Sequence, residues 1–292
     1  MNSILIAGAS SGIGAALARN YASSGAHLCL LGRNAERLAG VAVEVAERGA
    51  DCEQAVADIL DEPALRDAIR GYDSRHPVDL AFINAGIFDG RKEGEHLEDL
   101  ETSLRVIDNN LRGALNTLHA ILPAMRTRGS GHIVFVSSLA GLTPLGCALG
   151  YSASKSAIVS YALGLKQVLH GSGIRITVVC PGFIETPLAS QHLGWQPFKI
   201  TADKAARKIM RGIASRRAIV AFPFILHALA RPSILVPDVV RRAVGKAFAC
   251  AAGADMRIAG SDMSGIAARA PARRNRLFHR SHARIKACAF FA

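Results

Sequence analysis

The sequence is poor in several features that mark particular classes of protein. Aromatic residues make up only 5% of the chain, and Trp195 is its single tryptophan. No uncharged run reaches the roughly 20 residues that a membrane-spanning helix needs. The apolar stretch Ile4–Ala7 is too short for a signal peptide. We therefore expect a cytoplasmic protein that does not cross a membrane.

The cysteines show no pattern of metal binding or of a disulfide framework. There are six, and none forms a CxxC pair. Several lie in apolar runs, so we expect free, buried thiols in a reducing compartment and no metal site. They are Cys29, Cys52, Cys147, Cys180, Cys250 and Cys288.

Acidic residues are scarce in the last third of the chain. Residues 203–292 hold 18 Lys and Arg but only 4 Asp and Glu, whereas residues 1–202 hold 17 and 19. The net charge of +12 therefore belongs to the C-terminal part. A uniformly basic nucleic-acid-binding protein would not show this division, so we expect no specific nucleic-acid partner.

The sequence does contain a glycine-rich turn directly after its first apolar segment. Gly8, Gly12 and Gly14 follow the expected strand Ser3–Ala7 and open an expected helix. The first glycine permits a sharp turn, and the other two let the start of the helix approach a pyrophosphate closely. On its own, the motif is also compatible with an ordinary glycine turn.

A second stretch carries side chains suited to proton transfer. Tyr151 and Lys155 are four residues apart in a segment expected to be helical, 151–170, so both lie on one face. An ammonium group beside a phenol favours the phenolate and lowers its pKa. Ser138 follows an apolar run and offers a hydroxyl to the same oxygen. This set serves a carbonyl or an alcohol, but the hydride must come from a separate carrier.

Apolar segments alternate with helical patterns along most of the chain. This alternation predicts an α/β fold: a doubly wound, seven-stranded parallel sheet of the Rossmann type, with helices on both faces. A long helix is expected over 100–128. The seven expected strands are 3–7, 27–31, 51–57, 80–83, 133–136, 175–179 and 218–222.

Five motifs, in order, resemble those of the short-chain dehydrogenase/reductase family. They are AGASSGIG (7–14), INAG (83–86), NNLRG (109–113), the set of Ser138, Tyr151 and Lys155, and PGFIET (181–186). Together they cover roughly residues 1–190. The family usually has Thr where Ala7 stands, a difference that we expect to be tolerated.

The resemblance implies a role for each matching residue. Asn110, Ser138, Tyr151 and Lys155 would form the catalytic tetrad, in which Asn110 supports a proton relay to solvent. Tyr151 and Lys155 would also contact the cofactor. The other implied cofactor-binding residues are Gly8, Ser10, Ser11, Gly12, Ile13, Gly14, Asp58, Ile59, Asn84, Ala85, Gly86, Pro181, Gly182, Ile184 and Thr186. Asp58 is equally suited to capping the helix that follows it.

The end of the second expected strand bears on the choice of cofactor. NAD-specific relatives place an acidic residue there, whereas this chain has Gly32 and Arg33. A guanidinium suits the 2′-phosphate of NADPH, so we expect NADPH/NADP+ in preference to NAD. The alternative is that Arg33 is a solvated residue at the start of a helix.

The expected substrate is an apolar or neutral ketone or secondary alcohol. The loop 139–150 and Phe183 offer no charge to an anionic group. Trp195 and Phe198 either cap an apolar ligand or pack their own loop down. Two alternatives to the oxidoreductase stay open: a related epimerase or dehydratase, and a catalytically silent NADPH-binding or membrane-surface scaffold protein.

We divide the chain into three parts. Residues 1–222 are expected to form the catalytic domain. Residues 223–249 form an apolar and basic helical extension, which either contacts the inner face of an anionic membrane or packs on the body. Residues 250–292 form a basic, disordered tail. The expected helices 100–128 and 151–170 are the usual pairing surfaces of the family, so we expect a homodimer or homotetramer.

Overall fold

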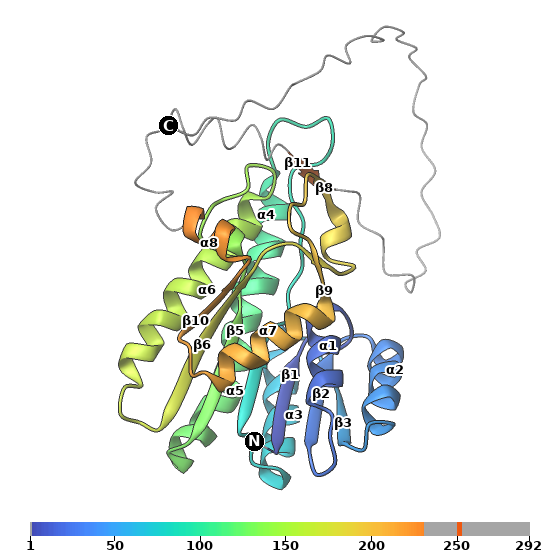
Figure 1. Cartoon of the computed structure of the whole chain (residues 1–292), viewed down its shortest axis with the longest axis vertical. Coiled ribbons are helices and arrows are strands. Elements are labelled where there is room, and N and C mark those ends of the chain that lie inside the picture. Colours follow the sequence, from blue (N-terminus) through green and yellow to red (C-terminus); the bar gives the residue numbers. More distant parts are fainter. Residues whose placement is uncertain (1, 231–249, 253–292) are drawn as a thin grey trace, which may run out of the picture. The chain divides into compact units, whose positions relative to one another are not determined.

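The computed structural model describes residues 2–230 and 250–252 (Figure 1). Seven strands form one parallel sheet, and short strands form two small pairs beside it. The strands of the large sheet are β1 (Ser3–Ala7), β2 (His27–Gly32), β3 (Asp51–Val56), β4 (Leu80–Ile83), β5 (Gly131–Val136), β6 (Ile174–Pro181) and β10 (Ile219–Phe222).

The strand order of the large sheet is β10-β6-β5-β4-β1-β2-β3, and each neighbouring pair is parallel. The chain moves outward from β1 to β3, and then returns to β4 and moves outward on the other side. This reversal leaves a crevice at the carboxyl ends of β1 and β4, where open α/β sheets bind ligands. The doubly wound seven-stranded sheet expected from the sequence is confirmed.

Helices cover both faces of the sheet, and each face has its own apolar core (Figure 1). One layer holds α1 (Gly12–Tyr21), α2 (Ala35–Ala46) and α7 (Ala202–Ala214). The opposite layer holds α3 (Glu62–Arg75), α5 (Gly113–Arg128) and α6 (Leu149–Val168). The strands bury side chains on both faces, which explains why their sequences are nearly continuous apolar runs.

The long helix expected over 100–128 is interrupted. It consists of α4 (Leu100–Ile107), a π-helical turn (Asp108–Arg112) and α5. Turns of this kind often occur at functional sites. Here the turn contains Asn110, whose side chain is fully buried and is held by the loop after β4.

Shorter elements complete the described residues. They are the 3₁₀ turns 139–141 and 189–191, β7 (Ile184–Glu185), β8 (His192–Gly194), β9 (Ile200–Thr201), α8 (Phe224–Ala230) and β11 (Cys250–Ala252). None of the described helices is long and apolar enough to cross a membrane.

The expected disorder of 250–292 is wrong at its first three residues. β11 pairs antiparallel with β8. Without this pairing, backbone N–H and C=O groups of both strands would lack a partner. In the expected helical extension, α8 is helical. The remaining parts of the two expectations, 231–249 and 253–292, lie outside the described residues.

A buried carboxylate joins the two helices α3 and α5 beneath the sheet. Asp73 is only 7% exposed. Its Oδ1 accepts a hydrogen bond from the backbone N–H of Val78 (2.9 Å), and its Oδ2 accepts one from the guanidinium of Arg128 (2.6 Å). Arg128 also donates to the carbonyl oxygen of Val78. Asp73 therefore fixes the turn that leads into β4.

We expect Asp73→Asn to lower the free energy of unfolding by about 1–3 kcal/mol, because an amide cannot accept both bonds in a buried site. The measurement is urea unfolding. Glu62→Gln is a matched control, since Glu62 forms an exposed ion pair with Arg66 and should change stability by at most about 0.5 kcal/mol. Equal stability of the two variants would show that Asp73 has no structural role.

Candidate active site

The glycine turn lies at the carboxyl end of β1, beside the crevice. Gly8 has a φ of +78°, which favours glycine, and its N–H donates to the carbonyl oxygen of Leu31. A Cβ on Gly14 would lie 2.0 Å from the carbonyl oxygen of Gly8, so the start of α1 packs directly on the turn. Ser11 precedes α1 in an extended conformation and makes no side-chain capping bond. The first N–H groups of α1 are therefore available to an anion.

Asn84, at the end of β4, holds this turn from the other side of the crevice. Its amide nitrogen donates to the carbonyl oxygens of Ala7 (3.2 Å) and Gly8 (3.1 Å). A Cβ on Gly8 would lie 2.7 Å from the Cα of Ala85. The motifs 7–14 and 83–86 thus form one rigid floor for the crevice.

The motif 181–186 reaches the same floor from the end of β6. A Cβ on Gly12 would lie 3.1 Å from the Cγ2 of Thr186, so these two residues are neighbours. Pro181 is the last residue of β6, and the N–H of Gly182 donates to the carbonyl oxygen of Phe222 (2.7 Å). Ile184 is 4% exposed and packs with Ile13 in the core beneath α1.

The side of the crevice at β2 and β3 carries a charged pair. Arg33 and Asp58 are joined by an ion pair of 3.4 Å, with side chains 48% and 38% exposed. Ser10 lies close to Gly32, with its Oγ 3.5 Å from a Cβ at that glycine. Arg33 therefore presents an open guanidinium beside the glycine turn. Ile59 is buried, and its Cδ1 would lie 2.4 Å from a Cβ on Gly113, so it packs against the long helix.

Asn110 is fully buried and ties the loop after β4 to α6. Its Oδ1 accepts from the N–H of Ile87 (2.7 Å), and its Nδ2 donates to the carbonyl oxygen of Ile87 (3.0 Å) and to the Oγ of Ser154 (3.1 Å). A Cβ on Gly86 would lie 2.8 Å from Asn110 Oδ1 and 3.4 Å from Lys155 Nζ. Asn110 and Lys155 therefore share a site that only a glycine at position 86 leaves open.

Tyr151, Lys155 and Ser138 meet at the ends of β5 and α6. Ser138 hydrogen-bonds the phenol of Tyr151. Lys155 Nζ lies 5.8 Å from the centroid of the Tyr151 ring and donates to the carbonyl oxygen of Val136 (3.1 Å). Tyr151 is 8% and Lys155 5% exposed. The structure thus brings together all four residues of the expected tetrad.

Burial dominates the ionisation of this pair. It raises the pKa of Tyr151 above its usual value, although the hydrogen bond with Ser138 acts in the opposite direction. Burial also lowers the pKa of Lys155 to about 8, with Cys180 opposing that shift. The structure therefore differs from the expectation that Lys155 lowers the pKa of Tyr151. A low dielectric favours the neutral form of both groups.

Apolar and aromatic side chains surround Tyr151. Phe88 packs edge-on against its ring, with centroids 5.0 Å apart, and His192 lies 5.8 Å from Phe88 and 5.2 Å from Phe183. Of the expected apolar wall, Leu145 and Cys147 belong to this cluster. Asp89, which follows Phe88 in the chain, is paired with Arg105. Phe88 and His192 were not expected, because no motif marks them.

Two expectations about side chains need comment. Trp195 and Phe198 are 61% and 56% exposed, so they do not pack their loop down tightly. The expectation of free thiols is wrong at Cys147, which is disulfide-bonded, whereas Cys29, Cys52 and Cys180 are free. Cys147 lies in the loop before α6 and not in a strand of the sheet.

Glu98 supports the helix of the site through contacts that the sequence does not reveal. It is 6% exposed and lies in the loop before α4. Its carboxylate accepts from the first N–H groups of α6, at Leu149 (2.6 Å) and Gly150 (2.9 Å), and from the Oγ of Ser103 (2.7 Å). A Cβ on Gly150 would lie 2.8 Å from this carboxylate. Glu98 thus caps the helix that carries Tyr151, across 51 residues of sequence.

This fold and site define a class: an α/β oxidoreductase with a nucleotide-binding crevice and a buried tyrosine, lysine and serine. A family model described as short chain dehydrogenase matches residues 2–196. The chain therefore belongs to the short-chain dehydrogenase/reductase family.

Individual relatives agree with this assignment. An uncharacterized oxidoreductase of Myxococcus xanthus is 34% identical over 235 residues, which are 80% of this chain and 92% of the relative. A 3-dehydrosphinganine reductase of Arabidopsis thaliana is 37% identical over 199 residues, which are 66% of this chain and 58% of that protein. A short-chain dehydrogenase from Sphingobium yanoikuyae, solved in complex with NADPH, superimposes with a TM-score of 0.69 at 25% identity, covering 90% of this chain and 99% of that one.

We expect Glu98→Ala to lower the free energy of unfolding by about 2–4 kcal/mol, because two N–H groups at the start of α6 lose a buried acceptor. The amide protons of Leu149 and Gly150 should then exchange faster with solvent, which hydrogen-exchange NMR measures. Glu95→Ala is the control, since Glu95 lies in the same loop with an exposed side chain. Unchanged exchange at both amides in Glu98→Ala would show that Glu98 does not cap the helix.

Proposed function

We propose that this protein is an NADP-dependent reductase or dehydrogenase that interconverts an apolar or neutral ketone and its secondary alcohol. The observation that carries the proposal is the buried meeting of Tyr151, Lys155, Ser138 and Asn110 beside a glycine turn at the crevice. When bound, the nicotinamide cofactor supplies or accepts the hydride. The chain itself has to hold the substrate oxygen and move its proton.

Tyr151 is the group proposed to move that proton. Its raised pKa keeps the phenol protonated near neutral pH, which is the form that can donate to a developing alkoxide. Ser138 bonds the same phenol and orients the substrate oxygen. Lys155 and Asn110 lie behind Tyr151, and the bonds from Asn110 to Ser154 and Ile87 support a relay that returns the proton from solvent.

The residues around the crevice fit a dinucleotide. Gly8 and Gly12 have positive φ values, and a Cβ on Gly8 or Gly14 would collide with neighbouring backbone atoms, so only glycines allow the tight turn that brings the start of α1 to the crevice. The uncapped start of α1 offers N–H groups to the pyrophosphate. Asn84, Ala85, Gly86 and Thr186 would hold the nicotinamide half, and Asp58 and Ile59 the adenine half. These roles remain proposals.

Arg33 supports NADPH in preference to NADH. Its guanidinium is half exposed, beside the glycine turn, and no acidic residue occupies position 32 or 33. Asp58 holds the guanidinium in place without covering it. A 2′-phosphate can therefore form charge-assisted bonds there.

The surroundings of Tyr151 support an apolar or neutral substrate. Phe88, Leu145 and Ala148 belong to the apolar cluster that contains Tyr151. The name of the Arabidopsis relative, a 3-dehydrosphinganine reductase, is in keeping with a ketone substrate of lipid type.

Three further proposals concern the rest of the chain. Residues 1–222 form the catalytic domain of a cytoplasmic protein. The exposed apolar residues Leu100 and Leu104 on α4 and Val168 on α6 support a homodimer or homotetramer. Contact of 223–249 with an anionic membrane rests on residues that lie largely outside the described part of the chain.

We expect Tyr151→Phe to lower kcat at least about 100-fold on any ketone that the wild-type enzyme reduces, because the proton donor is lost. The assay follows NADPH consumption over a panel of alkyl and aryl ketones. Tyr161→Phe is the matched control, since Tyr161 lies on the same helix with an exposed ring. Wild-type turnover by Tyr151→Phe would disprove the proposed mechanism.

We expect the protein to bind NADPH more tightly than NADH, and Arg33→Ala to weaken NADPH binding roughly tenfold without changing NADH binding. Parallel titrations followed by nicotinamide fluorescence measure both affinities. Arg48→Ala removes an exposed charge after α2 and serves as the control. Equal binding of the two cofactors by the wild type would assign Arg33 to the surface and favour alcohol oxidation with NAD.

A further inference from the structure

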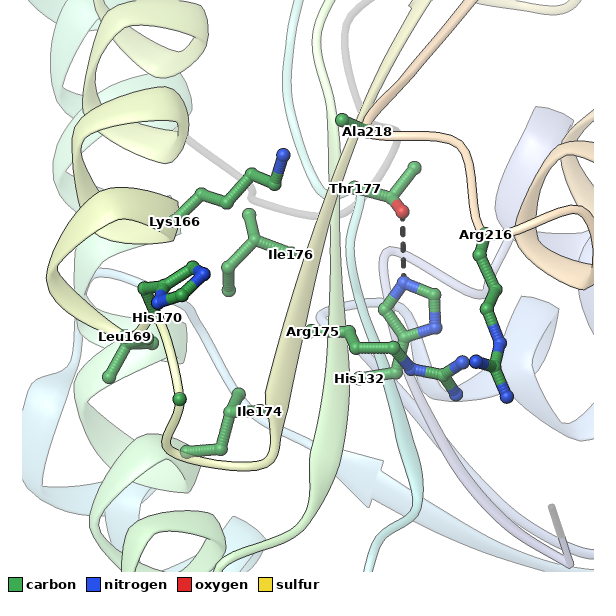
Figure 2. A pocket seen from close by; sticks show the side chains of 11 residues that line it. His132, Lys166, Leu169, His170, Ile174, Arg175, Ile176, Thr177, Arg216 and Ala218 are labelled. Carbon is green, nitrogen blue, oxygen red and sulfur yellow. Dashed lines mark hydrogen bonds between the residues drawn. The ribbon is translucent and has the colours of Figure 1, made fainter.

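A cavity of about 180 Å³ opens at the opposite ends of the strands from the candidate active site (Figure 2). Its walls come from the first residues of β5 and β6, the last turn of α6, and the turn between α7 and β10. None of the residues with a proposed catalytic or cofactor-binding role lines it. The cavity is therefore separate from the site described above.

The cavity is lined by basic and imidazole side chains and by no acidic one. They are His132, Lys166, His170, Arg175 and Arg216. In the part of the chain that the structure describes, Lys166, Arg175 and Arg216 have neither an ion pair nor a side-chain hydrogen bond, unlike Arg33, Arg66, Arg105 and Arg128. Unneutralised cations gathered at one place favour an anion.

His132 adds a buried nitrogen that lacks a partner. The residue is 1% exposed, and its Nε2 lies 2.9 Å from the Oγ1 of Thr177. That hydroxyl donates its one proton to the carbonyl oxygen of Arg217 (2.8 Å), so it accepts from His132, and the network assigns the proton to Nε2. Burial, with the charge of Arg175, lowers the pKa of His132 to about 4, which leaves Nδ1 as a bare acceptor. Nδ1 has no hydrogen-bond partner.

The unpartnered nitrogen and the two arginines converge. Figure 2 shows Nδ1 on the side of the His132 ring where the guanidinium groups of Arg175 and Arg216 come together. Arg216 has a φ of +53° because it ends α7 in a Schellman motif, in which its N–H and that of Arg217 donate to the carbonyl oxygens of Ile213 and Gly212. Both arginine side chains are exposed, so they can part to admit a small ion above Nδ1.

The edge of β6 supplies a further donor. On the side of β10, the N–H of Val178 donates to the carbonyl oxygen of Ala218. The first residue of β10, Ile219, lies opposite Val178. Since alternate residues of a strand bond to the same side, the N–H of Ile176 faces that side as well, before β10 begins. Ile176 lines the cavity.

We propose that this cavity binds inorganic phosphate as the hydrogen phosphate ion, which still carries a P–OH near neutral pH. Its charged oxygens accept from Arg175 and Arg216, and its hydroxyl donates to Nδ1 of His132. A buried polar atom without a partner is unfavourable, so a ligand that offers both a donor and acceptors is preferred. Sulfate has the same shape and charge but no hydroxyl near neutral pH, and it leaves Nδ1 unpaired.

The test is a calorimetric titration of the full-length protein at pH 7.5 with inorganic phosphate, with sulfate in parallel. Phosphate should bind saturably, and sulfate roughly tenfold more weakly. In ¹⁵N NMR, the Nδ1 resonance of His132 should shift on addition of phosphate. Arg175→Ala and Arg216→Ala should each weaken phosphate binding roughly tenfold. Arg211→Ala, which removes an exposed arginine of α7 outside the cavity, should leave it unchanged.

Arg33→Ala separates this cavity from the cofactor crevice, because phosphate bound beside the glycine turn would be lost in that variant only. Phenyl phosphate is a second comparison: it has lost its P–OH at pH 7.5, so it should bind as weakly as sulfate, and binding as tight as that of inorganic phosphate would overturn the proposal. The proposal is overturned if phosphate does not saturate, if it binds no better than sulfate, or if its binding is lost in Arg33→Ala and kept in Arg175→Ala and Arg216→Ala.

Discussion

The close approach of two turns, one after β1 and one after β4, is the constraint on which the rest of the site depends. Gly8 and Ala85 are so near that no side chain fits between them, and Asn84 bonds two carbonyl oxygens of the first turn. This contact fixes the crevice where the strand order reverses. The same loop continues to Ile87, which holds Asn110, and to Phe88, which packs on Tyr151. One short segment therefore sets both halves of the site.

Burial then determines what the tetrad can do. Tyr151 and Lys155 lie in a low-dielectric environment, where the charged form of each is disfavoured. A tyrosine that stays protonated can give a proton to the alkoxide that forms when a carbonyl is reduced. With its pKa lowered to about 8, Lys155 is mostly protonated at neutral pH. Removal of water also strengthens the bond from Ser138, since that bond acts without competition.

Much of this arrangement follows from the sequence. Local patterns place each strand, and short motifs place Gly8, Asn84 and Tyr151 at strand and helix ends. The cap that Glu98 provides to α6 is different, because it links residues 51 apart and needs a glycine at position 150 to make room. The helical pattern continues through the π-helical turn around Asn110, so periodicity alone does not locate that turn. The pKa of Tyr151 depends on its burial by segments that are distant in the sequence. The four-residue spacing between Tyr151 and Lys155 therefore does not predict the direction of its shift.

Helix α6 joins the two sites of the molecule. Its first turn holds Tyr151 and is fixed by Glu98, and its last turn carries Lys166 and borders the basic cavity. A helix is stiff along its axis, so a force on one end is transmitted to the other. Coupling between the two sites nevertheless requires two conformations of the protein that differ in the position of α6. A ligand in the cavity would have to bind one of these conformations more tightly than the other. Ile158 and Ala162 anchor the middle of α6 in the core, so the packing opposes a displacement of the helix and favours independent binding at the two sites.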